Sequence, residues 1–220
     1  GNDRQLGGAG SDRMTGDDDN DILLGDNGLL DYRADGDLST LDTIRTSAPG
    51  TGGNDQMAGN AGDDTLLGGA GSDGIMGNAG DAIALGDNGV ISLIENQVDQ
   101  IATTDPTVGG QDVISGSFGQ DTILGGARGD VLRGDEDSDT ILGDHGVLEF
   151  TFDGDARVSA DTDRSTLDYV ATTDPTAGGR DFIEGGLGDD YILGGTEGDT
   201  VFGDGSLDIT ESTWQLIGGD

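Results

Sequence analysis

Residues 7–28 read GGAGSDRMTGDDDNDILLGDNG, and this stretch decides the fold because its acids and apolar residues keep a fixed spacing. Asp12 and Asp21 lie nine residues apart, and Met14 and Leu23 follow them two places later. The same spacing continues in ten nonapeptides, which begin at Gly7, Gly16, Gly59, Gly68, Gly77, Gly116, Gly125, Gly134, Gly185 and Gly194. Nine of the ten carry Asp in sixth place and an aliphatic residue or Met in eighth place. The spacing predicts one structural unit that repeats along the chain.

The composition by itself is that of an acidic, weakly hydrophobic chain. The 220 residues include 45 acids and 9 bases, for a net charge of −36, and 44 are Gly. Such a composition is typical of disorder, but a disordered linker has no fixed period, so the period favours a folded structure. Of the acids 39 are Asp, which suits tight turns as Gly does. The charge repels nucleic acids and anionic membranes, so we expect cations as partners, no nucleic acid and no membrane insertion.

Two of the nonapeptides, GGAGSDRMT at 7–15 and GGLGDDYIL at 185–193, match the pattern G-G-x-G-x-D-x-U-x, where U is a large apolar residue. This pattern resembles the calcium-binding nonapeptide of the repeats-in-toxin (RTX) family, and the resemblance covers about half of the chain. It implies an all-β fold, a parallel β-roll or β-solenoid. In that fold each nonapeptide forms a six-residue turn and a three-residue strand. Ca²⁺ ions bind between successive turns, through the sixth-place Asp carboxylates and turn carbonyls.

The candidate metal ligands are the repeated acids. Calcium takes six to eight oxygen ligands, more than one turn offers, so two stacked turns must share an ion. The sixth-place acids and the matching acids of the block openings are Asp3, Asp12, Asp21, Asp55, Asp64, Asp73, Asp112, Asp121, Asp130, Asp139, Asp181, Asp190 and Asp199. Acids of the closing signatures are end ligands or only turn formers, and we favour ligands: Asp26, Asp87, Asp144 and Asp204.

One nonapeptide, GNAGDAIAL at 77–85, departs from the pattern. Ala82 stands in sixth place and Ala84 in eighth, while Asp81 comes one place early. We expect the calcium site that would use Ala82 to be weak or absent, unless a one-residue shift brings Asp81 into its place.

The nonapeptides fall into blocks, which we expect to form one solenoid fragment over 1–220, a window on a longer array. The blocks span 1–28, 52–89, 109–146 and 178–205, and most of them close with GDNG or a close variant. Between them lie insertions at 29–51, 90–108, 147–177 and 206–217. The three long insertions begin with apolar runs and return through a Pro, which predicts β-hairpins, or pairs of strands, that leave the roll and pack along one face.

The sequence holds no recognisable catalytic constellation, so we expect no enzyme active site. There is no Cys and one histidine, His145, which replaces Asn27 and Asn88 of the closing signature. His145 is therefore predicted to be a turn residue rather than a catalytic base or zinc ligand. Asp105 and Asp174, in the sequence TTDP, are predicted to be turn caps rather than metal ligands.

The resemblance implies a calcium-folded structural or spacer segment of a large secreted or cell-surface bacterial protein of adhesin or matrix type. Its partners would then be calcium ions and neighbouring repeats of the same chain. The alternative is a calcium-dependent folding and secretion module of an enzyme or toxin exported by type I secretion. A third reading, a ligand-binding surface carried by the insertions, ranks last because they lack flat Thr arrays and aromatic clusters.

Overall fold

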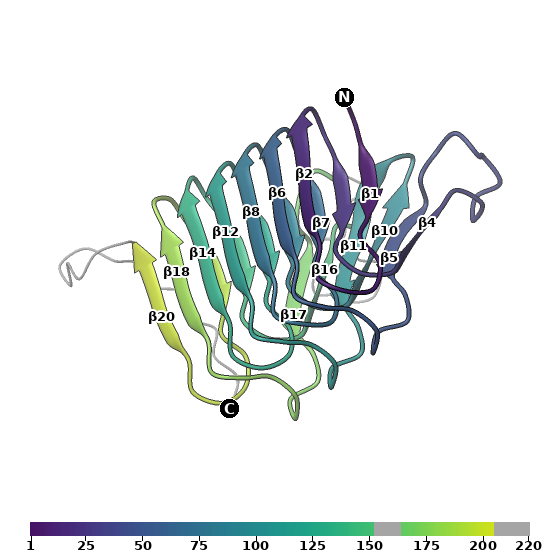
Figure 1. Ribbon diagram of the computed structural model, residues 1–220. Helices are drawn as coiled ribbons and strands as arrows, with labels where there is room; N and C mark the ends of the chain where they lie inside the picture. The colour runs from purple at the N-terminus through teal and green to yellow at the C-terminus, as the bar shows by residue number, and fades with distance from the viewer. Residues whose placement is uncertain (152–163, 205–220) are drawn as a thin grey trace.

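The chain winds as a roll whose coils add strands alternately to two parallel sheets. A computed structural model describes residues 1–151 and 164–204 (Figure 1). The middle sheet contains, in spatial order, β1 (Arg4–Leu6), β3 (Ile22–Leu24), β7 (Thr65–Leu67), β9 (Ile83–Leu85), β13 (Thr122–Leu124), β15 (Thr140–Leu142) and β19 (Tyr191–Leu193). The outer sheet contains β2 (Arg13–Asp18), β6 (Gln56–Ala61), β8 (Gly74–Ala79), β12 (Val113–Phe118), β14 (Val131–Glu136), β18 (Phe182–Gly186) and β20 (Thr200–Asp204). Figure 1 shows the strands of the outer sheet side by side across the front of the molecule.

The eighth-place residues of the nonapeptides form a core between these two sheets. In the three-residue strands of the middle sheet from β3 onward the central residue is buried, as with Leu23, Leu66 and Ile123. From the outer sheet, Met14 and Ile114 enter the same cluster. Each such side chain contributes about 1.5–3 kcal/mol when fully buried. The predicted parallel β-roll is therefore confirmed, with its core at the position that the repeat assigns.

A third sheet covers the other face of the middle sheet. This hairpin sheet is antiparallel and contains, in spatial order, β17 (Tyr169–Thr172), β16 (Gly146–Glu149), β11 (Gln97–Thr103), β10 (Gly89–Ile94), β5 (Thr43–Thr46) and β4 (Gly28–Asp31). Its buried residues Ile44, Ile91, Ile101 and Leu148 pack in a second core. The middle sheet supplies the last residue of its strands to that core: Leu24, Leu67, Leu85, Leu124 and Leu142. Because successive side chains of a strand point to opposite faces, the middle sheet is buried on both.

The hairpin sheet is made from the three long insertions. Strands β4 and β5 pair within the first, β10 and β11 within the second, and β16 and β17 within the third. Neighbouring hairpins also pair, β5 with β10 and β11 with β16, so three insertions become one sheet. The predicted hairpins along one face of the roll are confirmed. Residues 152–163 of the third insertion and the predicted insertion 206–217 lie outside the described residues.

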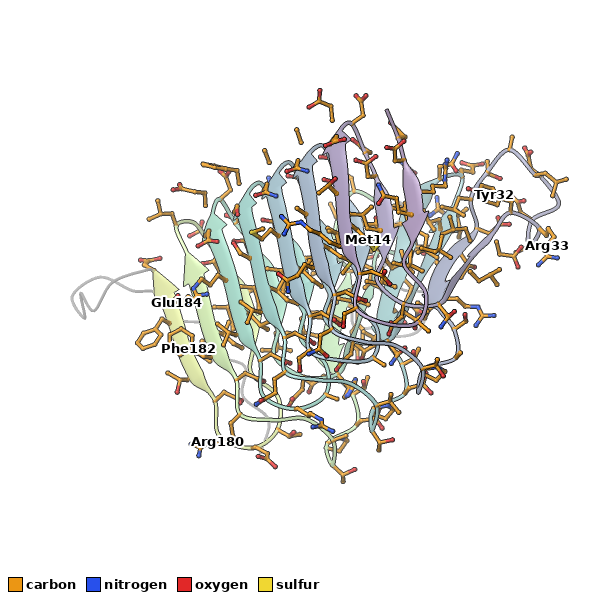
Figure 2. All side chains as sticks on the ribbon, viewed as in Figure 1. Met14, Tyr32, Arg33, Arg180, Phe182 and Glu184 are labelled. Atoms are coloured by element: carbon orange, nitrogen blue, oxygen red, sulfur yellow. The ribbon has the colours of Figure 1, made fainter. Side chains whose placement is uncertain are left out.

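Several basic side chains lie next to acids or aromatic rings on the surface. On the outer sheet, Arg133 forms an ion pair with Glu184 at 2.8 Å, across β14 and β18. The ring of Phe182 (Figure 2) lies 5.6 Å from that of Phe202, measured between the ring centroids. At the first hairpin, Arg33 contacts Asp31 at 2.9 Å (Figure 2). These pairs are local, and exposed ion pairs contribute about 0–1 kcal/mol each.

Candidate metal sites

The turns between strands gather along two edges of the roll, and the repeated acids lie there. We call the turns from the outer to the middle sheet the first edge, and the turns from the middle back to the outer sheet the second edge. The first edge carries Asp3, Asp21, Asp64, Asp121, Asp139 and Asp190. The second edge carries Asp12, Asp55, Asp73, Asp112, Asp130, Asp181 and Asp199. Acids that lie 18–51 residues apart in sequence thus become neighbours in two rows.

One carboxylate oxygen of these acids links the coils of the roll. Wherever the next coil carries an Asp in sixth place, the backbone N–H of the sixth-place residue donates to Oδ1 of that Asp. On the first edge Asp21 N–H donates to Asp64 Oδ1 at 2.8 Å. On the second edge Asp55 N–H donates to Asp73 Oδ1 at 2.7 Å. Every bond of this kind between two acids measures between 2.6 and 3.0 Å.

The second carboxylate oxygen has no hydrogen-bond partner. Among the described residues, Oδ2 is buried and unpaired in Asp12, Asp21, Asp55, Asp64, Asp73, Asp112, Asp121, Asp130, Asp139, Asp181 and Asp190. A buried polar atom normally finds a partner, and an unpaired buried charge is costly. Eleven such oxygens in two regular rows indicate a missing partner that is positively charged.

Backbone carbonyls approach the same places, and the first-place glycines make room for them. A Cβ added to Gly16 would lie 2.2 Å from Asp21 Oδ2 and 2.7 Å from the carbonyl oxygen of Gly59. No side chain fits at such distances, so this position requires Gly. The carboxylate of one turn and the carbonyl of the next coil thus crowd one small space.

These donors fit a hard divalent cation. Within residues 1–151 and 164–204, no three Asp, Glu, His or Cys side chains gather where they could hold a metal ion by themselves. Carbonyl oxygens must therefore complete the set. Calcium accepts mixed carboxylate and carbonyl oxygens in flexible geometry, whereas magnesium requires a near-ideal octahedron. The residues present fit Ca²⁺, whose charge would offset the unpaired oxygens of adjacent coils.

Burial raises the pKa of many of these acids. Desolvation, with the nearby charge of Asp112 adding to it, raises the pKa of Asp130 to about 10. Desolvation likewise raises the pKa of Asp73 to about 8 and that of Asp121 to about 7. Burial also raises the pKa values of Asp139 and Asp181 to about 7. In the absence of a cation these carboxyl groups hold protons near neutral pH, and a bound cation would displace them.

Comparison with known families agrees with this geometry. The chain matches the sequence model of the RTX calcium-binding nonapeptide repeat (four copies) over residues 1–28, 49–83, 108–127, 124–147 and 176–209, more than half of its length. The chain belongs to the RTX calcium-binding repeat family. A search of curated protein sequences finds no match. The RTX repeat is a structural calcium-binding module rather than a catalytic one, so calcium ions are partners of this chain.

On the first edge, the row of N–H to Oδ1 bonds between coils, which we call the ladder, is interrupted at the nonapeptide 77–85. Ala82 N–H donates to Asp121 Oδ1 at 2.8 Å, but Ala82 offers no carboxylate to the preceding coil. Asp81 does not replace it, because its N–H donates to Asp63 and its Oδ1 accepts from Gln120. The one-residue shift does not occur, and the turn lacks a sixth-place carboxylate.

The closing acids of the RTX blocks have a different environment. Oδ1 of Asp26 accepts the N–H of Gly53 at 3.1 Å, and Oδ2 accepts that of Ala70 at 2.5 Å. Equivalent bonds run from Gly110 and Ala127 to Asp87, and from Gly179 and Thr196 to Asp144. Asp204 is exposed at the end of β20. The first three acids therefore fasten turns, and calcium binding by the four stays a prediction.

His145 and the TTDP acids lie in turns. His145 is buried, and desolvation lowers its pKa, so its ring is neutral at pH 7. The equivalent Asn88 donates to the carbonyl of Val108 at 3.3 Å. Asp105 and Asp174 each accept a backbone bond from the residue three places later, at 2.9 and 3.0 Å, as turn residues do.

The structure shows one arrangement that sequence reasoning missed. The three long insertions do not separate whole repeats; each one interrupts a nonapeptide between its first and sixth places. Gly25 is the first residue of a repeat whose sixth and eighth residues are Asp55 and Met57. The signal was present, since GGNDQM at 52–57 ends like a nonapeptide and GDNG at 25–28 begins like one.

Proposed function

We propose that this RTX segment is a calcium-folded structural spacer of a large secreted or cell-surface bacterial protein, of adhesin or matrix type. The observation that carries the proposal is the double row of eleven buried, unpaired Asp oxygens. Cations bound along such rows would hold successive coils together, which is a structural role.

The same rows explain why folding would depend on calcium. Without cations, the buried carboxyl groups of adjacent coils must either take up protons or repel one another as unpaired charges, and a net charge of −36 opposes any compact state. A ligand that binds only the folded form stabilises that form by mass action. Extracellular calcium modules bind with dissociation constants of about 10⁻⁴–10⁻³ M. The chain would thus stay unfolded at cytosolic calcium and fold outside the cell.

Export before folding is in keeping with the family, because RTX repeat proteins are generally secreted by type I systems. The layered build supports a spacer role. Each coil lengthens the roll by about 4.8 Å, the distance between neighbouring strands. The hairpin sheet runs along the coils that carry it and joins them through a second core, which stiffens the roll.

The test is a far-UV circular dichroism titration with Ca²⁺, starting from a chelated sample and with Mg²⁺ as the control. We expect a cooperative transition from coil to β structure between sub-millimolar and millimolar Ca²⁺, and none with Mg²⁺. At about pH 8, where most of the buried acids have lost their protons, a full β signal in chelator would contradict the proposal. Sequencing of the gene around the segment separates the alternatives: many similar blocks favour a spacer, and an adjoining catalytic domain favours a secretion module.

A further inference from the structure

We infer that the three interrupted nonapeptides are complete calcium sites, so that calcium bound on the second edge fastens the base of each hairpin to the roll. The inference rests on the proposed calcium-dependent folding and adds a role for the insertions. We call the three interrupted repeats the split turns. They join Gly25 to Asp55, Gly86 to Asp112, and Gly143 to Asp181.

The split turns have the geometry of an uninterrupted turn. A Cβ added to Gly25 would lie 2.3 Å from Asp55 Oδ2 and 2.7 Å from the carbonyl oxygen of Gly68. For the uninterrupted turn at Gly16 the corresponding distances are 2.2 and 2.7 Å. At the split turn of Gly86 they are 2.3 and 2.7 Å, and at that of Gly143 they are 2.2 and 2.3 Å. Each split turn has more than twenty residues beyond the four that separate the first and sixth places of an uninterrupted turn, and the cradle still keeps its geometry.

The ladder of the second edge passes through the split turns without a break. Asp73 N–H donates to Asp112 Oδ1, and Asp112 N–H donates to Asp130 Oδ1, at 2.7 and 2.8 Å. Asp112 is 1 % exposed, and its Oδ2 has no partner. The same holds for Asp55 and Asp181, which are 0 % and 3 % exposed. A buried, unpaired oxygen therefore points into each cradle, as at the uninterrupted turns.

In each split turn, the second residue is an Asp that also holds the base of the hairpin through hydrogen bonds. Asp87 follows Gly86 directly and accepts N–H bonds from Gly110, at the end of the insertion, and from Ala127 in the next coil. Its two oxygens are thus used in joining both ends of the insertion to the neighbouring turn. The carboxylate that remains available to calcium in the split turn is that of the sixth-place Asp. A calcium ion bound there would hold the hairpin base to the roll a second time.

All three split turns lie on the second edge, so the hairpins leave the roll in a row and pair with one another. Because both ends of a hairpin belong to one calcium site, loss of that ion frees the hairpin ends as well as the coil. An ion on the first edge joins coils only, since no insertion lies in the described turns there. Calcium on the two edges should therefore affect the hairpin sheet differently.

The experiment compares Asp112→Asn, in a split turn, with the matched control Asp121→Asn, in an uninterrupted turn of the first edge. Both residues are 1 % exposed, and both have an unpaired Oδ2. Asn keeps the size and the oxygen that accepts the backbone bond, but it loses the charge. Bound calcium is counted by equilibrium dialysis, and hydrogen exchange of residues 90–103 is followed by mass spectrometry at saturating Ca²⁺.

We expect both variants to bind fewer ions than the unmodified chain. In Asp112→Asn, residues 90–103 should exchange about tenfold faster, while in Asp121→Asn their exchange should stay within about twofold. An unchanged ion count in Asp112→Asn alone would overturn the inference and leave the proposed function standing, as would equal exchange in the two variants. An unchanged ion count in both would instead overturn the proposed function.

A second variant keeps the inference testable if Asp112→Asn does not fold. Replacing residues 27–54 by Ala-Gly-Ser keeps the closing acid Asp26 and turns the first split turn into the contiguous nonapeptide GDAGSDQMA, which matches the repeat at Gly7 in five of its first six residues. This hairpin is at the end of the hairpin sheet, so the other two remain paired. We expect the ion count to be unchanged. A lower count would show that the insertion itself supplies ligands, which contradicts a complete site in the split turn.

Discussion

At the scale of single residues, the sixth-place Asp of an inner coil has two separate tasks. Oδ1 accepts the backbone N–H of the previous coil, and Oδ2 stays buried without a partner. The longer Glu would carry the second oxygen out of the cradle, which accounts for Asp rather than Glu at all thirteen sixth-place and block-opening acids. The sequence predicts a ligand role for these acids, because the spacing within one repeat places them in the turns. The bond from the neighbouring coil to Oδ1 is not predicted, since it depends on how the coils stack. The position of Asp81 is not predicted either, because pairing of β9 with β7 and β13 holds Ala84 opposite Leu66 and Ile123.

Ala82→Asp should complete the ladder of the first edge. The new carboxylate would accept the free backbone N–H of Asp64 and point its second oxygen toward Gly77, whose Cβ position lies 2.8 Å from that of Ala82. We expect at least one additional bound calcium ion and a calcium midpoint of folding lowered about threefold or more, since binding to the folded form stabilises it. Equilibrium dialysis and circular dichroism titration measure the two quantities.

The matched control for this substitution is Ala34→Asp, which adds the same charge at an exposed position of the first hairpin. It should leave the ion count unchanged and shift the midpoint only slightly. If Ala82→Asp binds no further ion, the missing carboxylate is not what distinguishes this turn from its neighbours.

At the scale of elements, the hairpins follow from local sequence, but their assembly does not. The apolar runs LLDY and VISLI predict strands, and the Pro of each insertion predicts the turn that leads back to the roll. Pairing of β5 with β10, or of β11 with β16, joins different insertions. That pairing depends on the distance between coils and on the edge from which the hairpins leave. No local pattern in the sequence reports either quantity.

The second core should make the hairpin sheet a substantial part of the stability. Ile101 in β11 is 0 % exposed and packs against the middle sheet, so Ile101→Ala should lower the free energy of unfolding by about 2–5 kcal/mol. Ile94→Ala, at a residue that is 42 % exposed in the same hairpin, should cost less than about 1 kcal/mol. Urea denaturation at saturating Ca²⁺ measures both. Equal losses would mean that the sheet adds little to the stability of the roll.

At the scale of the whole molecule, the fold combines a calcium-binding roll with a core that needs no metal ligand. The family repeat predicts the two parallel sheets, their core and the two acidic edges. It does not predict three layers. The last residue of each middle strand, such as Leu67 or Leu124, could equally be an exposed strand residue, and only the structure shows that the hairpin sheet covers it. Calcium on the edges and apolar contacts on the face thus hold the same coils by two different interactions, which meet at the split turns.

The buried acids predict how the metal-free protein responds to pH. Their ordinary pKa is 3.8, and burial raises the pKa to about 7 in Asp121 and about 8 in Asp73. A group with a raised folded pKa stabilises the fold fully below its unfolded pKa and loses that contribution as pH rises through the folded value. In chelator, the β signal should therefore be largest near pH 4 and fall between about pH 4 and pH 8. With calcium, which replaces the protons, the apparent affinity should rise over the same range.

A salt titration separates burial of these acids from the repulsion of the whole charge. At about 1 M NaCl the screening length falls to about 3 Å, which weakens repulsion between exposed acids but reaches buried carboxylates much less. In chelator at pH 8, salt should restore only a small part of the β signal seen at pH 4. If salt restores all of it, net charge rather than the buried rows opposes folding. The unpaired Asp oxygens would then not be the reason why this roll requires calcium.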